Sequence, residues 1–199
     1  HEVFGVELKS VNDNSTFLSD EFTFDCEQSK EENAQVVRMT LDLSDNSSLV
    51  YIYKIYNTGN LSRDYLIDFD IVEHNIAKHL AANESLKLTW RSRSNKNERS
   101  YQNENMATNI IYFEDGDMEE FDTSGEKETL ENISWIAYKQ QYFTSAFISS
   151  ENLMAEAEFK NSTKQGADFM KDFKSTISLP LSKDKTIYNY AFYYGPNDL

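Results

Sequence analysis

The sequence contains few of the residues that cross-link a fold or interrupt its helices and strands. Its 199 residues include 1 Cys, 2 Pro and 6 Gly. A single thiol cannot form an internal disulfide, so a disulfide framework is excluded. The low counts of Pro and Gly exclude collagen-like and proline-rich chains. Basic residues are also few, because 19 Lys and Arg stand against 34 Asp and Glu.

The resulting net charge of −15 restricts the partners of the chain. Nucleic-acid binding requires a basic face that displaces counterions from phosphate, and anionic lipid attracts clusters of Lys and Arg. We therefore expect neither ligand. No apolar run approaches the ~20 residues that cross a bilayer, and no signal peptide is present. Because His1 runs almost at once into strand-like sequence, we expect an excised fragment whose membrane attachment, if any, lies outside it.

Aromatic residues, by contrast, are abundant: 12 Tyr, 13 Phe and 2 Trp. Tyr and Phe favour pleated, half-buried surfaces. Apolar and polar residues alternate in several segments, which predicts strands with one buried face at residues 37–43, 65–71, 86–91 and 173–181. Further segments are apolar on both faces and fit central strands, namely residues 49–56, 135–148 and 187–194. About ten strand candidates in all predict an all-β sandwich or barrel.

Signals for helices are few. Residues Ile76 to Leu80 predict a single turn, and Glu126 to Asn132 predict either a short helix or a charged loop. Asn152 to Phe159 has high helix propensity but also alternates, so its state stays open. Neither an internal repeat nor a low-complexity linker interrupts the chain, and we expect residues 1–199 to form one domain.

Candidate metal sites have weak support in the sequence. His74 and His79 are five residues apart, which fits neither a helical nor a strand pair of zinc ligands, and we expect exposed or loop histidines. The turn Asp115-Gly-Asp117 carries carboxylates that could bind calcium, but the full calcium-loop pattern is absent. A solvated hairpin turn is therefore the preferred interpretation of that segment.

Candidate catalytic groups are equally weak. Asp68 and Asp70 share a strand face about 7 Å apart. This spacing does not identify a pair of glycosidase carboxylates, because their separation depends on how the side chains are aimed. Cys26 has the acidic neighbours Asp25 and Glu27, which oppose thiolate formation. We predict no catalytic residue, no cofactor and no metal.

The most distinctive segment is Trp135-Ile-Ala-Tyr-Lys-Gln-Gln-Tyr-Phe-Thr-Ser-Ala-Phe-Ile148. It could form an aromatic platform for a ligand. Strands that are aromatic on both faces are ordinarily packing elements, however, and the preferred hypothesis is a central hairpin of the core.

The same segment resembles the Trp-x-Ala-x-x-Gln-x-Tyr/Phe-Phe signature of the periplasmic domain of YidC membrane-protein insertases. Residues Arg99 to Asn109 resemble the segment ahead of that signature in Bacteroidetes-type members, and Tyr190 to Asn197 resemble the Tyr/Phe-x-Gly-Pro strand that closes the domain. The resemblance is close over Leu49 to Leu199 and thinner over His1 to Ser48.

This resemblance implies a β-supersandwich of the galactose-mutarotase type, with few short helices. It also implies a place in the periplasm, within an inner-membrane protein whose insertase activity resides in a membrane-embedded core absent from this sequence. The family's domains carry further strands ahead of the point where His1 falls, so we expect the first strands and both membrane flanks to be missing. The motif residues are expected to serve packing and turns: Trp135, Ala137, Gln140, Tyr142, Phe143, Gly195 and Pro196.

The leading hypothesis is thus a non-catalytic periplasmic domain that assists insertion and folding of membrane proteins. Sec-translocon accessory proteins and membrane-protein clients are its expected partners, through long edge strands. A carbohydrate-binding or carbohydrate-processing sandwich is the alternative, and it predicts exposed aromatics beside paired carboxylates. An adhesin-like surface domain is a third possibility.

Overall fold

The structure is a computed structural model that describes residues 2–10, 12–13, 15–43, 46–80, 85–121, 129–149, 154–162, 168–181 and 186–197. Within these residues the chain is almost entirely β-structure. The strands are β1 (Glu2–Lys9), β2 (Thr16–Leu18), β3 (Asp25–Glu31), β4 (Ala34–Leu43), β5 (Ser47–Tyr56), β6 (Leu66–His74), β7 (Ser85–Asn95), β8 (Asn109–Glu114), β9 (Asp117–Glu120), β10 (Thr129–Lys139), β11 (Phe143–Ser149), β12 (Met154–Ser162), β13 (Phe169–Pro180) and β14 (Ile187–Pro196). The helical segments are the 3₁₀ turns η1 (Ser19–Glu21) and η2 (Ile76–His79) and the helices α1 (Leu61–Asp64) and α2 (Tyr101–Met106).

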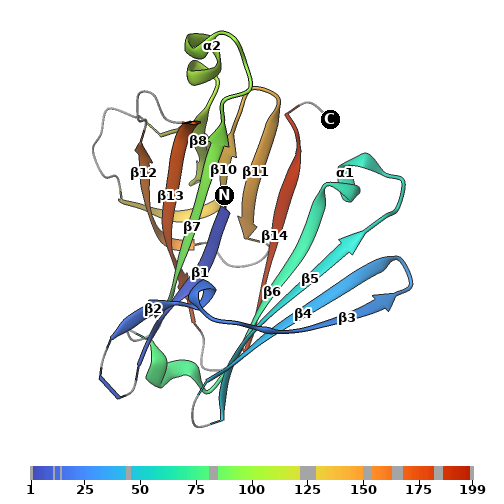
Figure 1. Ribbon diagram of the computed structural model, residues 1–199, viewed down its shortest axis with the longest axis vertical. Helices are drawn as coiled ribbons and strands as arrows, with labels where there is room; N and C mark the ends of the chain where they lie inside the picture. The colour runs from blue at the N-terminus through green and yellow to red at the C-terminus, as the bar shows by residue number, and fades with distance from the viewer. Residues whose placement is uncertain are drawn as a thin grey trace.

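All fourteen strands of the described residues belong to one antiparallel sheet (Figure 1). Its order is β2-β1-β7-β13-β12-β10-β11-β14-β6-β5-β4-β3, with β8 and β9 attached at β10. The β2 and β3 strands are therefore the two ends of the path. The all-β fold class with few short helices, expected from the aromatic alternation, is confirmed.

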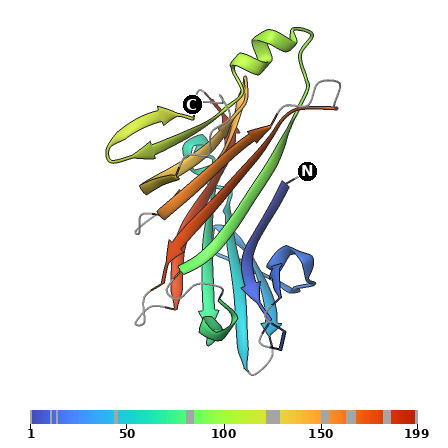
Figure 2. The same ribbon diagram turned by 90° about the vertical axis from the view of Figure 1, so that its left-hand side faces the viewer.

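Strand β10 bends and so joins the two halves of the sheet. Its first residues pair with β12 and its last residues pair with both β11 and β8. The register with β8 shifts between Ile133 and Trp135, next to Asn132, whose φ is 57°. An irregularity of this kind bends a strand and increases its local twist. The bend lets the sheet curve so that its halves face each other (Figures 1 and 2).

Aromatic rings from both halves meet in the space between them. Phe4 of β1 contacts Phe69 of β6 and Phe192 of β14, at ring-centroid distances of 5.2 and 5.1 Å. Trp90 of β7 stacks on Tyr138 of β10 at 4.0 Å. Since these pairs come from strands that are not hydrogen-bonded neighbours, they pack face against face. Such rings bury large apolar areas and prefer offset or edge-on contacts.

The alternation that predicts strands also predicts their buried faces. Leu86, Leu88 and Trp90 of β7 are each fully buried, as are Phe173 and Ile177 of β13. Met39, Leu41 and Leu43 of β4 pack in or against the same core. Lys87 and Lys174, on the opposite faces of the same strands, are exposed.

The helix predictions have mixed outcomes. The single turn at Ile76 is confirmed as η2. For residues 126–132 the sequence predicts a short helix or a charged loop. Residues 126–128 lie outside the described residues, and 129–132 belong to β10, so both alternatives are wrong for 129–132. The ambiguous segment 152–159 is strand from Met154 onward, with 152–153 outside the described residues. Pairing with neighbouring strands outweighs the local helix propensity of both segments, because each adds a strand to the sheet.

Candidate functional site

The motif residues occupy the β10–β11 hairpin and the end of β14. Phe143, the first residue of β11, lies opposite Pro196 in the antiparallel register. Gln140 and Tyr142 lie in the turn before it, so these residues and Gly195 gather at one end of the sheet. Trp135 and Ala137 lie farther along β10, away from the turn.

The turn of this hairpin is fastened to β14 by Asn197. The Asn197 side-chain amide donates hydrogen bonds to the carbonyl oxygens of Gln140 and Gln141, at 2.9 and 3.0 Å. Its backbone N–H donates to the carbonyl oxygen of Tyr142 at 2.9 Å, and the Gln140 N–H donates to that of Phe143 at 2.8 Å. The turn is thus held through backbone groups, while the rings of Tyr142 and Phe143 remain 58% and 62% exposed.

Gly195 is required by a close approach of two tyrosine rings. A Cβ at this position would lie 2.5 Å from the hydroxyl oxygen of Tyr193 and 2.9 Å from Cγ of Tyr65. The Tyr193 hydroxyl donates to the carbonyl oxygen of Pro196 at 2.6 Å, which holds its ring over the glycine. A larger residue would displace the Tyr193 ring, because its Cβ would overlap atoms of that ring.

Trp135 is half-buried and stacks on Phe113 of β8 at a centroid distance of 5.8 Å. Farther along the hairpin, the rings of Tyr138 and Phe147 are buried in the core. The hydroxyl of Tyr138 hydrogen-bonds the carbonyl oxygen of Trp90 at 2.8 Å and Oγ of Ser175 at 2.7 Å. Burial raises the pKa of Tyr138, so its phenol stays neutral. The middle of the hairpin is therefore core, Trp135 is half-buried, and the exposed rings of Tyr142 and Phe143 lie at the turn end.

A partly buried charged cluster on β7 and β13, in which Asp172 and Lys171 are buried and the side chains of Arg91 and Arg93 are each 38% exposed, has no counterpart in the sequence-based predictions. Asp172 accepts hydrogen bonds from Arg91, with Nε at 2.7 Å, and from Nε of Arg93 at 3.0 Å. The Arg91 guanidinium is the main reason that the pKa of Asp172 lies below its usual range. Next to it, the buried Lys171 donates to the Thr108 carbonyl oxygen and to the side-chain oxygen of Asn109. Burial lowers the pKa of Lys171.

No pattern in the sequence reveals this cluster, because Lys171 and Asp172 are adjacent and are nevertheless both buried. The register between β13 and β7 shifts just before Lys171. Such an irregularity changes how successive side chains are aimed. The cluster links β7 and β13 to the segment between α2 and β8, which assigns it to the framework of the fold.

The two described histidines differ in their surroundings. His74, at the end of β6, is exposed as expected. His79 is only 3% exposed, so the expectation of an exposed or loop histidine is wrong there. The Nδ1 atom of His79 lies 3.2 Å from the carbonyl oxygen of Lys9. The chain reverses through η2 and turns the imidazole toward β1, which no local pattern indicates.

The carboxylates singled out in the sequence have separate roles. Asp68 forms an ion pair with Arg63 at 2.7 Å, and Asp70 accepts from the side-chain amide of Asn189 at 2.7 Å. The Asp115-Gly116 turn joins β8 to β9 with φ values of 50° and 100°, which fits a two-residue hairpin turn. The preferred interpretation of that turn as a solvated hairpin is thus confirmed.

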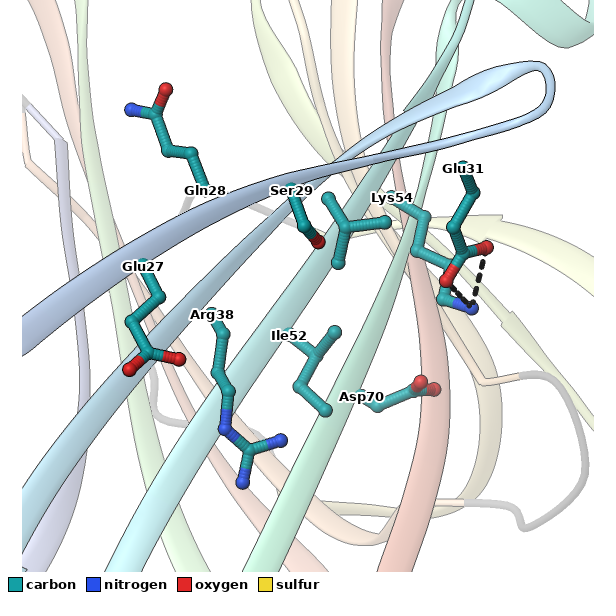
Figure 3. Close-up of a pocket in the computed structure, with 9 residues that line it drawn as sticks. Glu27, Gln28, Ser29, Glu31, Arg38, Ile52, Lys54 and Asp70 are labelled. Atoms are coloured by element: carbon teal, nitrogen blue, oxygen red, sulfur yellow. Dashed lines mark hydrogen bonds and ion pairs between the residues drawn. The ribbon is translucent and has the colours of Figure 1, made fainter.

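An open hollow of about 670 Å³ lies on the outer face of β3–β6 (Figure 3). Its charged groups are Glu27 and Glu31 of β3, Arg38 of β4, Lys54 of β5 and Asp70 of β6. Lys54 and Glu31 form an ion pair at 3.3 Å. The residues that line it include carboxylates and the apolar Val36 and Ile52, with no aromatic ring. The hollow therefore lacks the aromatic face that the carbohydrate-binding alternative predicts.

Within the residues that the structure describes, no helix is long and apolar enough to cross a membrane. The fold and these surfaces define the class of the protein. It is an all-β domain built on one curved sheet, with an aromatic core to which Tyr138 and Phe147 of the β10–β11 hairpin belong and a charged face on the strands β3–β6.

Comparison with known families gives the particular member of this class. Residues 4–199 match the family described as the YidC periplasmic domain, so the chain belongs to that family. The match begins at residue 4, so it includes most of the segment His1 to Ser48, in which few family motifs could be recognised from the sequence. The family is non-catalytic, and the domain is periplasmic.

Curated relatives from Bacteroidetes carry the name "Membrane protein insertase YidC". The chain is 28% identical over 175 residues to the Bacteroides fragilis protein, a match that covers 84% of this chain and 27% of the relative. It is 26% identical over 201 residues to the protein of Azobacteroides pseudotrichonymphae, a match that covers 98% of this chain and 31% of that relative. It is 25% identical over 174 residues to the Porphyromonas gingivalis protein, a match that covers 84% of this chain and 27% of that relative. The chain thus spans about a quarter to a third of the length of these relatives.

Proposed function

We propose that this domain is an auxiliary, non-catalytic part of an inner-membrane insertase, where it supplies an interaction surface during the insertion and folding of membrane proteins. The observation that carries the proposal is the family match over residues 4–199. The names of the relatives support it. The net charge of −15 suits a domain that stands off anionic headgroups while other segments hold it near the membrane.

The fold is proposed to be a β-supersandwich of the galactose-mutarotase type, with residues 1–199 forming one domain. The face-to-face ring contacts between β1 or β7 and β6, β10 or β14 support a sandwich arrangement. We assign the motif residues structural roles in it. Trp135 and Ala137 pack, Gln140 shapes the turn, and Gly195 makes room for tyrosine rings.

Sec-translocon accessory proteins and membrane-protein clients are the proposed partners. Both expose polypeptide to the periplasm, and a protein surface with free strand edges binds extended polypeptide by pairing with it. Neither a cofactor nor a nucleic acid has a role in this proposal.

The proposal is tested by deleting the domain from the full-length insertase. The variant joins the flanking segments through a flexible linker in place of residues 4–199, and insertion of a reporter membrane protein is followed by protease protection in proteoliposomes. An auxiliary role predicts slower insertion that is still well above protein-free vesicles. A complete loss of insertion, by a variant that is stable and correctly embedded, would contradict that role.

A further inference from the structure

We propose that the free edge of β3 binds an extended peptide segment with alternating basic residues, which adds to the sheet as a further strand. Strand β3 is one end of the strand order, and among the described residues it pairs only with β4. All seven of its residues, Asp25–Glu31, are exposed. An edge strand presents a row of backbone N–H and C=O groups that a further strand can pair with.

The charge of this edge determines the kind of strand that fits. Alternate residues of a strand share a face, so Asp25, Glu27, Ser29 and Glu31 lie together, and three of these four are acidic. Glu31 forms an ion pair with Lys54. Glu27 lies opposite Arg38 in the register with β4, and Figure 3 draws no hydrogen bond or ion pair between these two side chains. A basic side chain on an incoming strand gains a carboxylate partner there, since opposite charges on neighbouring strands stabilise their pairing.

The same charges oppose pairing between two copies of this chain. In an antiparallel pair of β3 strands centred on Gln28, Asp25 of each copy lies opposite Glu31 of the other. Like charges directly opposite each other destabilise a strand pair. In this register the like charges disfavour self-association, whereas a strand of the opposite charge gains favourable pairs.

This inference extends the proposed function by naming the chemistry of a partner, and its test uses the chain of residues 1–199 alone. A negative result would remove the β3 edge as the binding surface and would leave the auxiliary role to the deletion experiment. The two proposals therefore fail separately.

The probe is the heptapeptide Thr-Lys-Val-Lys-Val-Lys-Thr, which places its lysines on one face of a strand. It is titrated into ¹⁵N-labelled protein at low ionic strength while amide signals and amide hydrogen exchange are recorded. We expect the signals of residues 25–31 to shift most. We also expect exchange to slow at every second amide of β3, because only alternate residues direct their backbone groups outward in an antiparallel pair.

Two control peptides separate charge from strand pairing. In Thr-Glu-Val-Glu-Val-Glu-Thr the charges are reversed, and in Thr-Lys-Pro-Lys-Pro-Lys-Thr the charge is kept but backbone donors are lost. Neither should protect the β3 amides. Shifts spread over the acidic surface for all lysine peptides alike, or no shift at millimolar peptide, would overturn the proposal.

Matched variants locate the charge. Glu27→Gln should weaken binding of the lysine heptapeptide about two- to fivefold, the range given by one opposite-charge pair across strands. Glu156→Gln changes an exposed glutamate on β12, an interior strand, and should leave the affinity unchanged. Equal effects of the two substitutions would contradict a site on β3.

The single cysteine provides an independent reading. Cys26 is exposed on β3, so its reaction with a chromogenic disulfide reagent reports on access to that edge. Saturating lysine heptapeptide should slow the reaction several-fold, and the proline peptide should not. An unchanged rate with the heptapeptide bound would place the peptide elsewhere and would overturn the proposal.

Discussion

The hydroxyl of Tyr138 offers a sharp test of the conclusion that the motif hairpin is core. In Tyr138→Phe the ring keeps its stacking on Trp90, at 4.0 Å, and on Phe173, at 4.9 Å. Only the hydrogen bonds to the Trp90 carbonyl oxygen and to Ser175 Oγ are lost. Ser175 is completely buried, so its hydroxyl loses a partner that water cannot replace.

The magnitude follows from this geometry. A typical hydrogen bond contributes about 1 kcal/mol net, and an unsatisfied buried group costs about 1–3 kcal/mol. Removing the buried hydroxyl also removes its own desolvation, so we expect Tyr138→Phe to lower the free energy of unfolding by about 1–2 kcal/mol. For a chain of this length that corresponds to about 2–8 °C in Tm.

Urea unfolding followed by tryptophan fluorescence measures this change. The matched control is Tyr142→Phe, in the same hairpin, whose hydroxyl is exposed and receives only the Gln141 amide at 3.0 Å. Exposed substitutions of this kind usually change stability by less than about 0.5 kcal/mol. A loss for Tyr138→Phe no larger than for Tyr142→Phe would refute the argument that the hairpin is buried through its centre.

Three further predictions concern Gly195 and the buried charges. Gly195→Ala should lower the free energy of unfolding by about 1–3 kcal/mol, because the added methyl overlaps the Tyr193 phenol; an unchanged Tm would contradict this. The pKa of Asp172 is lowered mainly by Arg91, so its stabilisation is complete above its unfolded value of about 3.9 and is lost as pH falls through the folded pKa. Asp172→Asn should therefore lower the stability at pH 7, and its urea midpoint should fall less than that of the wild type as the pH is lowered. An equal fall of the two midpoints with pH would contradict the ion pair. Burial lowers the pKa of Lys171. Below its unfolded value of about 10.4 the unfolded chain then binds more protons, so wild type should gain stability relative to Lys171→Met as pH rises through the folded pKa, and a constant difference would contradict this.

The parts of the fold that follow from the sequence are those in which side chains alternate against a core. Leu86, Leu88 and Trp90 show this pattern, and their burial follows directly. The strand order does not follow, because any antiparallel pair of such strands satisfies the pattern equally well. Strand β10 pairs with β12, β11 and β8, and its register with β8 shifts next to Asn132; no local pattern in its sequence indicates this set of partners.

Strands and helices without an apolar face could not be predicted from the sequence. Strand β3 reads Asp-Cys-Glu-Gln-Ser-Lys-Glu and has no buried face, since its pairing with β4 alone holds it in the sheet. Helix α2 has no apolar periodicity either, and it begins where the side chain of Ser100 accepts the N–H of Asn103. The motif residues could be located on strands and turns from the sequence. The proximity of the hairpin turn to Asn197 depends on the sheet.

Labelling of Cys26 in the full-length protein tests the central claim, a periplasmic domain of an inner-membrane insertase, most directly. Cys26 is exposed on β3, and intact spheroplasts are treated with a membrane-impermeant maleimide, with Cys26→Ser as the control for other thiols. A periplasmic domain predicts labelling that depends on Cys26 and reaches the same extent before and after lysis. Labelling of Cys26 only after lysis would contradict the claim.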